Sequence, residues 1–145
     1  MMTTTDLETI DAATFGQGLR GVALNLLCRD VRAMADFLRG CLGMSVHRLS
    51  NDFAIVVHDT TMMQLHADGT YGAHPLLGLL PESPPRGAGV QMFVMGVDPD
   101  AACARAEDHG GVVVEMPSDK PHGLREATIL SPEGYAFSPA VARRT

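Results

Sequence analysis

The hydrophobic positions along the chain fall into two similar series, each with an aliphatic run, an amphipathic segment and several short extended runs. In the first series, residues 22–28 form an aliphatic run that is typical of a buried strand. Apolar residues recur at three- and four-residue steps over 31–42, which predicts a helix with Asp30 as its N-cap and Gly43 after its end. Three shorter strands are predicted at 44–47, 53–58 and 62–66.

The second series repeats this order. A strand is predicted at 90–95, and Asp98 followed by Pro99 is suited to begin the next helix. The remaining strands are predicted at 112–116, 124–130 and 135–138, with a tight turn at 131–134. Gly43 and Gly110, which end the two helices, are 67 residues apart, and the same offset separates Val22 from Gly89 at the start of the two series, which indicates a duplicated module.

The pattern therefore predicts one structural domain of the α+β class, built from two fused β-α-β-β-β modules. In chain order we expect an N-terminal extension, the first module, a linker rich in proline and glycine, the second module and a tail, at residues 1–21, 22–67, 68–88, 89–141 and 142–145. The extension should carry a short helix held to the domain by Phe15 and Leu19. We expect the leucine run at 76–80 to cover an edge of the core, with lining a ligand mouth as the alternative.

Composition and charge narrow the class of partner. Of the 145 residues, 46% are hydrophobic and 19% charged, which is ordinary for a globular protein, and the net charge of −6 argues against sequence-independent binding to nucleic acid. No signal-peptide pattern and no apolar run of about 20 residues is present, so we expect no membrane association and take the cytoplasm as the default location. The three cysteines match no zinc spacing, and we expect buried, reduced thiols.

Four segments between residues 21 and 141 resemble the glyoxalase / bleomycin-resistance / extradiol-dioxygenase superfamily, also called vicinal oxygen chelate proteins. They are LNLLCRDVRAMADFLRGCLGM, MMQLHAD, VQMFVMGVDPDAACARAEDHGG and KPHGLREATILSPEGYAFS. The resemblance implies that the strands of the paired modules curl into a half-open barrel around a ligand cavity. It also implies that the cavity is completed in a homodimer, so we expect a second copy of the chain as a partner.

Enzymes of this superfamily bind a divalent metal through four side chains, on the first and last strands of each module. Carried over to this chain, the first-strand positions fall on Ala23 and Gly89, and the last-strand positions on Gln64 and Ser138. Alanine and glycine have no donor atom, and neutral amide and hydroxyl oxygens are poor ligands for a catalytic metal. We therefore expect neither a metal nor another cofactor, and no catalytic residue is assigned.

The two-residue period of a strand places other polar side chains on the same faces. Asn25 shares a face with Ala23, and His66 shares one with Gln64, so the cavity should contain a polar patch in apolar surroundings. Arg125 is interpreted first as a structural ion pair with Glu115 or Glu126, and second as an anion clamp. The expected ligand-binding residues are Asn25, Gln64, His66, Gln91, Arg125 and Ser138. His47 is expected at the surface.

Three functions remain open from the sequence. The first is a metal-free cavity that binds a small organic ligand, as the bleomycin-resistance branch does by sequestration. The second is a metal-dependent lyase, isomerase or dioxygenase with a divalent metal at a displaced site near His66. The third is a non-catalytic interaction module. We favour the first, with a small organic molecule as partner.

Overall fold

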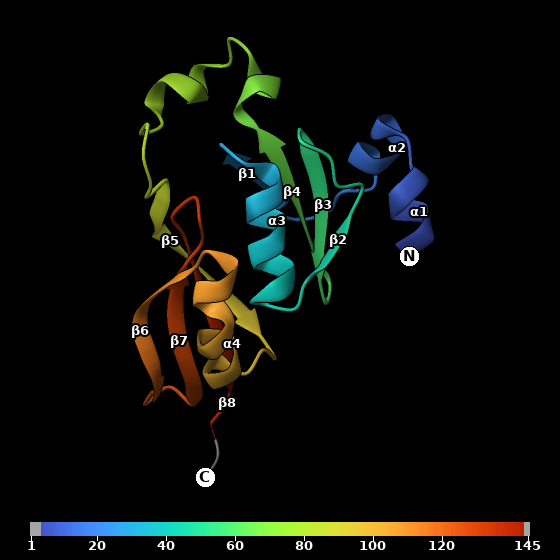
Figure 1. The fold of residues 1–145 in the computed structure, drawn as a ribbon. Helices are drawn as coiled ribbons and strands as arrows, with labels where there is room; N and C mark the ends of the chain where they lie inside the picture. The colour runs from blue at the N-terminus through green and yellow to red at the C-terminus, as the bar shows by residue number, and fades with distance from the viewer. Residues whose placement is uncertain (1–3, 144–145) are drawn as a thin grey trace.

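The computed structural model describes residues 4–143, which fold into two α+β modules (Figure 1). The first module comprises β1 (Leu24–Cys28), α3 (Val31–Gly40), β2 (Ser45–His47), β3 (Phe53–His58) and β4 (Thr61–Ala67). Its four strands form sheet 1 in the order β1-β4-β3-β2. The β1–β4 pair is parallel and the other pairs are antiparallel.

The second module repeats this topology. It comprises β5 (Gly87–Met95), α4 (Pro99–Ala106), the short 3-10 helix η3 (Glu107–His109), β6 (Val112–Asp119), β7 (Leu124–Leu130) and β8 (Tyr135–Ala142). Its strands form sheet 2 in the order β5-β8-β7-β6, again with the first pair parallel. The duplicated α+β architecture is confirmed, and the two sheets do not close into a barrel.

Several boundaries differ from the predicted ones. β5 begins at Gly87, inside the segment expected to be linker, and β8 continues to Ala142. The expected tail therefore begins within a strand, and residues 144–145 lie outside the described residues. None of the helices within residues 4–143 combines the length and apolar character needed to cross a bilayer.

Helix α3 joins the two modules through one hydrophobic core. Asp30 caps its start by accepting a hydrogen bond from the backbone N–H of Ala33 at 2.9 Å, as predicted. Its apolar stripe, including the fully buried Met34, packs on sheet 1. Phe37 points to the second module, where its ring centroid lies 5.9 Å from that of Phe137 on β8. Because both rings are fully buried, this contact ties the modules together.

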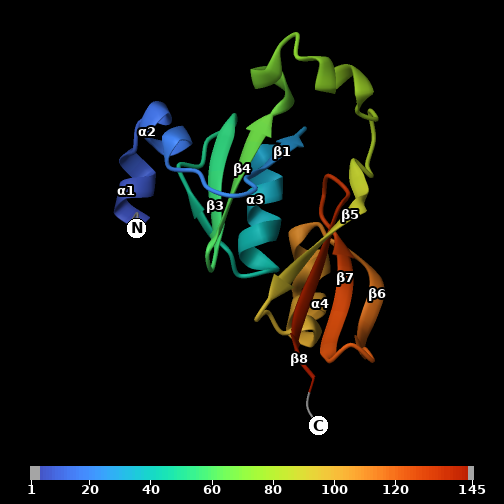
Figure 2. The same cartoon turned by 180° about the vertical axis from the view of Figure 1, so that it is seen from behind.

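The N-terminal extension contains two helices, α1 (Thr4–Thr9) and α2 (Ala12–Gln17), beside β2 and β3 (Figures 1 and 2). They cover the free face of sheet 1, which we define as the face opposite α3. Leu7 and Phe15 form a separate apolar cluster with Ile55 of β3, and Leu19 packs against it. The expected anchoring by Phe15 and Leu19 is thus observed, while residues 1–3 of the extension lie outside the described residues.

The segment between the modules contains two short 3-10 helices, η1 (Asp68–Tyr71) and η2 (Pro75–Leu79), and arcs away from both sheets (Figure 1). The leucine run does not cover a core edge, because Leu76 and Leu79 are 46% and 79% exposed. That expectation was wrong: the arc carries these side chains away from the apolar surface that they would need to cover.

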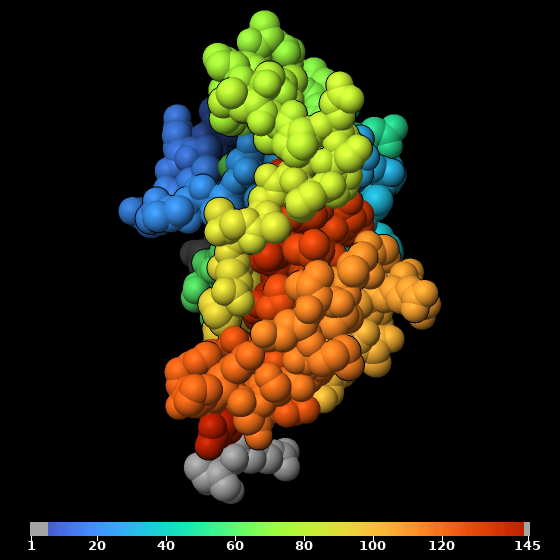
Figure 3. Space-filling model, turned by 90° about the vertical axis from the view of Figure 1, so that its left-hand side faces the viewer, coloured from blue at the N-terminus to red at the C-terminus, as the bar shows by residue number. Residues whose placement is uncertain are grey.

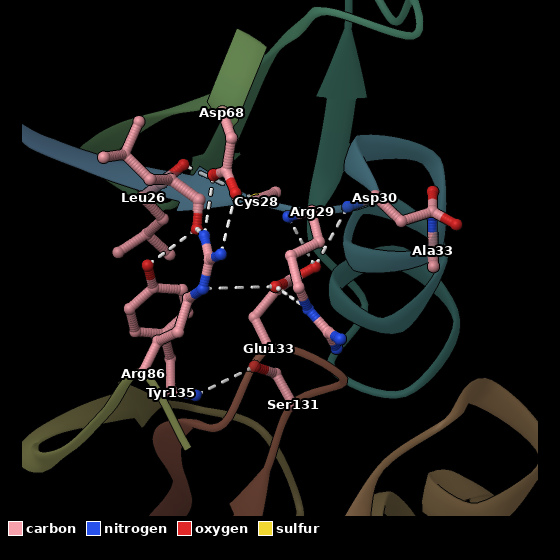
Figure 4. Close-up of polar contacts among 11 residues, drawn as sticks. Leu26, Cys28, Arg29, Asp30, Ala33, Asp68, Arg86, Ser131, Glu133 and Tyr135 are labelled. Carbon is pink, nitrogen blue, oxygen red and sulfur yellow. Dashed lines mark hydrogen bonds and ion pairs between the residues drawn. The ribbon is translucent and has the colours of Figure 1, made fainter. Parts of the chain in front are cut away.

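A buried carboxylate holds the β7–β8 turn against the first module (Figure 4). Glu133 is 1% exposed. Its Oε2 accepts hydrogen bonds from the backbone N–H groups of Arg29 and Asp30, at 3.0 and 3.1 Å, where α3 begins. Its Oε1 lies 3.3 Å from Nε of Arg29 and 3.9 Å from Nε of Arg86. The second module thereby supplies a negative charge to the N-terminus of a helix in the first, a favourable arrangement for the helix dipole.

Two further contacts complete this group, which we call the Glu133 cluster. Arg86 donates to both carboxylate oxygens of Asp68, each at 2.7 Å, and its side chain is only 4% exposed. The Tyr135 hydroxyl donates to the carbonyl oxygen of Leu27 at 2.7 Å, and burial raises the pKa of Tyr135 to about 12, so the donor proton is retained. The cluster thus connects β1, η1, the start of β5 and the β7–β8 turn.

Gly134 permits the close approach on which the cluster depends. Its φ is +80°, and a Cβ at this position would lie 2.3 Å from the Cα of Pro85. No other residue can occupy such a position without a shift of the backbone. The tight turn predicted at 131–134 is therefore also the contact between the second module and the connecting segment.

Replacing Glu133 by glutamine should lower the free energy of unfolding by about 3 kcal/mol, because Arg29 and Arg86 would lose their shared buried counter-charge. Urea denaturation at neutral pH measures this change. Glu82→Gln, an exposed position in the connecting segment, is the matched control and should change stability by less than about 0.5 kcal/mol. Equal effects of the two variants would contradict the role assigned to the cluster.

Candidate functional site

A cavity of about 380 Å³ lies between α2 and the free face of sheet 1. Most of its surface is contributed by apolar atoms, although half of the lining residues are polar. The lining residues are Ala12, Phe15, Gly16, Arg48, Asp52, Phe53, Ile55, Gln64, His66 and Thr70. The volume is at the lower end of the range of about 300–1,000 Å³ that is typical of small-molecule sites.

His66 is held in place by neighbours on three sides. Its Nδ1 lies 2.6 Å from Oδ1 of Asn25 on β1, and Nδ2 of Asn25 in turn donates to the hydroxyl of Tyr71. The His66 ring makes a T-shaped contact with the Phe53 ring, with centroids 4.9 Å apart. The centroid of the Tyr71 ring lies 5.7 Å from that of His66. The imidazole therefore has a fixed position in the sheet rather than a mobile one.

The Glu133 cluster reaches this group through η1. Asp68, which Arg86 holds, is the first residue of η1, and Tyr71 is the last. A shift of Asp68 would consequently move the hydroxyl that Asn25 contacts. This link could not be predicted from the sequence, because Asp68, Arg86 and Tyr71 are in a segment whose composition predicts only irregular structure.

Burial lowers the pKa of His66 below its ordinary value, so the imidazole is neutral at pH 7. The lining residues include one basic and one acidic side chain, Arg48 and Asp52. The Arg48 guanidinium is already bonded to the carbonyl oxygen of Ile10. The cavity therefore has no net charge to offer an ionic ligand.

Gln91 and Ser138 lie apart from this cavity, on sheet 2. The amide of Gln91 donates to Oγ of Ser138 at 2.9 Å, and Oγ1 of Thr128 lies 3.0 Å from the same oxygen. Within one chain, the predicted set therefore divides into Asn25, Gln64 and His66 on one sheet and the Gln91–Ser138 pair on the other.

Arg125 joins neither group. It forms ion pairs with Asp100 of α4, at 2.8 Å, and Asp119 of β6, at 3.2 Å. The hydrogen bonds to Asp100 and Asp119 raise the pKa of Arg125. A structural ion pair is therefore present on the α4 side of sheet 2, but its partners are Asp100 and Asp119 rather than the expected Glu115 or Glu126.

The residue types do not fit the metal site of related enzymes. Ala23 and Gly89 have no donor atom, and the hydroxyl of Ser138 is buried and already hydrogen-bonded. Nδ1 of His66 is taken by Asn25. Within residues 4–143, no three His, Cys, Asp or Glu side chains are grouped so as to hold a metal ion.

The contribution of the N-terminal extension was missed. Phe15 was expected to pin a helix, and the structure shows that the same ring forms a wall of the cavity. His47 was expected at the surface but is 5% exposed, because α1 covers it and Glu8 contacts its Nδ1 at 3.2 Å. The extension carries little periodic signal, so nothing in the sequence indicated which face it covers.

A second hollow, of about 550 Å³, also borders the extension. It is lined by residues such as Leu19, Val22 and Asp59, and by none of the predicted ligand-binding residues. The cavity that contains Gln64 and His66 is therefore the better candidate site.

Comparison with known proteins identifies the family. The family model for the Glyoxalase/Bleomycin resistance protein/Dioxygenase superfamily matches residues 21–138, and the chain belongs to this superfamily. The resemblance seen in the sequence is thereby confirmed. No curated protein matches the chain.

Solved structures share the fold at low sequence identity. The hypothetical protein SA1046 from S. aureus is 19% identical with a TM-score of 0.67, over 88% of this chain and 98% of that one. A glyoxalase/bleomycin resistance protein/dioxygenase family enzyme from Burkholderia phytofirmans PsJN is 20% identical with a TM-score of 0.67, over 83% and 97%. TioX from Micromonospora sp. ML1 is 17% identical with a TM-score of 0.60, over 87% and 98%. At these identities the likeness shows the fold alone.

Asp68→Asn should destabilise the protein by about 1–2 kcal/mol at pH 7. Hydrogen bonds from Arg86 lower the pKa of Asp68, whereas the neutral amide has no charge and only one oxygen to accept them. A carboxyl whose pKa is lowered by folding stabilises the folded state at pH values above its unfolded-state pKa of about 3.9. This stabilisation is lost as the pH falls through the folded-state pKa. The difference between variant and wild type should therefore shrink towards zero in urea titrations as the pH falls below the unfolded value and through the lowered folded value. Asp59→Asn, at an exposed position, is the matched control and should change stability by less than about 0.5 kcal/mol at pH 7. An equal loss from Asp68→Asn at pH 7 and in acid would refute the assignment.

Proposed function

We propose that the protein binds a small organic molecule, without a metal, in the cavity between α2 and sheet 1. The observation that carries this proposal is the combination of aromatic walls, Phe15 and Phe53, with one convergent polar group around His66. An apolar cavity with a few fixed polar groups is the usual form of a small-molecule site. The superfamily fold positions the polar group, and the N-terminal extension closes the cavity over it.

The choice of a metal-free site rests on donor chemistry. Catalytic zinc sites use at least three imidazole, thiolate or carboxylate ligands. Around the cavity, His66 is the one imidazole and Asp52 the one carboxylate among the lining residues, and Gln64 supplies a neutral amide. This set suits hydrogen bonding to an organic ligand better than coordination of a cation.

The homodimer expected from the superfamily is also part of the proposal. Val94 faces the core at 3% exposure. Phe93 and Met95 lie on the opposite face of sheet 2, which we call its free face because α4 does not cover it, and are 45% and 49% exposed. Val112 on the same face is 59% exposed. In Figure 3, the yellow atoms of β5 run beside the orange and red atoms of the following strands, open to solvent. A second copy that covers this face would remove the exposed apolar surface from water.

Gly16→Trp should abolish ligand binding by filling the cavity, since nothing lies within 4 Å of a Cβ at this position. Ligand-observed NMR with a set of neutral one- and two-ring compounds measures this. Hits should bind the wild type and lose binding in Gly16→Trp. Gly78→Trp, at a glycine of η2 with equally open space, is the matched control and should retain binding. Hits that bind Gly16→Trp and wild type alike would place the site elsewhere.

Phe93→Asp should convert a dimer to a monomer, because a carboxylate on the free face of sheet 2 would be buried without a counter-charge. Sedimentation velocity of the wild type should give a dimer. Leu79→Asp, at an exposed leucine of η2, should leave the dimer intact. A monomeric wild type at micromolar concentration would contradict the proposed assembly.

A further inference from the structure

The proton on the His66 imidazole is assigned by its neighbours. Asn25 donates its amide N–H to the Tyr71 hydroxyl, which leaves its carbonyl oxygen facing Nδ1 of His66 at 2.6 Å. With the Asn25 amide in this orientation, its carbonyl oxygen can only accept a hydrogen bond, which places the proton on Nδ1. Asn25 and Tyr71 are in this sense positioning residues, which act on a ligand through His66.

The other ring nitrogen is consequently an acceptor. In a neutral imidazole with its proton on Nδ1, Nε2 has a free lone pair. Within residues 4–143, the hydrogen bond of His66 is made by Nδ1, and no side chain or backbone N–H is bonded to Nε2. His66 lines the cavity, where the Phe53 ring fixes its orientation by the T-shaped contact.

The rest of the lining sets the class of molecule. Phe15 and Phe53 offer ring surface on which an apolar or aromatic group can pack. Arg48 and Asp52 balance one another at the rim, so neither an anion nor a cation is favoured. Because the cavity measures about 380 Å³, it suits a molecule of one or two rings rather than a large planar drug.

We propose that the ligand is a neutral one- or two-ring aromatic molecule that presents a hydroxyl or N–H donor to Nε2 of His66. This inference rests on the proposed function and names the chemistry of its ligand. A site with a fixed acceptor discriminates strongly against an analogue that lacks the donor, since the acceptor is then left unpaired in the complex.

The full-length protein can be tested with a pair of probes that differ only in the donor, 4-methylphenol and 4-methylanisole. Titrations followed by protein NMR should show that wild type binds 4-methylphenol about tenfold more tightly, the effect of one hydrogen bond. His66→Phe keeps a ring but removes the acceptor, and it should bind the two probes equally. Unchanged dispersion of the NMR spectrum checks that this variant is folded.

The remaining outcomes separate the inference from the proposed function. Equal affinity of the wild type for both probes, with binding of both lost in Gly16→Trp, would overturn the donor assignment while leaving the cavity as the ligand site. If neither probe bound, or if binding survived in Gly16→Trp, both the assignment and the proposed function would be overturned.

The tautomer itself has an independent readout in the ring-nitrogen NMR shifts of His66. The protonated-type shift should belong to Nδ1 in the wild type. Asn25→Leu removes the acceptor at an exposed position, so the ring should move towards the Nε2–H form and the preference for 4-methylphenol should fall. An Nε2–H tautomer in the wild type would overturn the inference.

Discussion

The structure depends on the buried carboxylate of Glu133, which belongs to one module and caps a helix of the other. At 1% exposure, it must be compensated, and two backbone N–H groups together with Arg29 and Arg86 provide this. Apolar packing between Phe37 and Phe137 depends little on direction, whereas the hydrogen bonds of a carboxylate depend strongly on it. The cluster therefore constrains how the modules are oriented, while the shared core that includes Phe37 and Phe137 buries apolar surface between them.

This constraint extends to the cavity. Arg86 ties Asp68 to the cluster, and η1 carries this attachment to Tyr71, which contacts Asn25 and so orients His66. Each step from Arg86 to His66 is either a hydrogen bond or the single helical turn of η1. A site that discriminates by one hydrogen bond needs such support, because a loosely held acceptor would accommodate many geometries.

The sequence predicted the helices and strands whose positions follow from hydrophobic periodicity or from flanking turn residues. Helix α3 was predicted because its apolar stripe is regular, and β3 and β7 because each is a short run between turn residues. It could not show that the predicted polar residues divide between two sheets, since strand patterns give a face but not the position of one module relative to another. The wall formed by Phe15 was equally hidden, because the extension has weak periodicity and packs only through tertiary contact.

Ala23 and Gly89, to which the resemblance assigns the first-strand metal positions, have no donor atom in their side chains. The most direct test is a crystal structure grown with both zinc chloride and 4-methylphenol. The account predicts the phenol ring between Phe15 and Phe53, with its hydroxyl at hydrogen-bond distance from Nε2 of His66 and no zinc in the cavity. A zinc ion held inside the cavity by three or more protein atoms would contradict it.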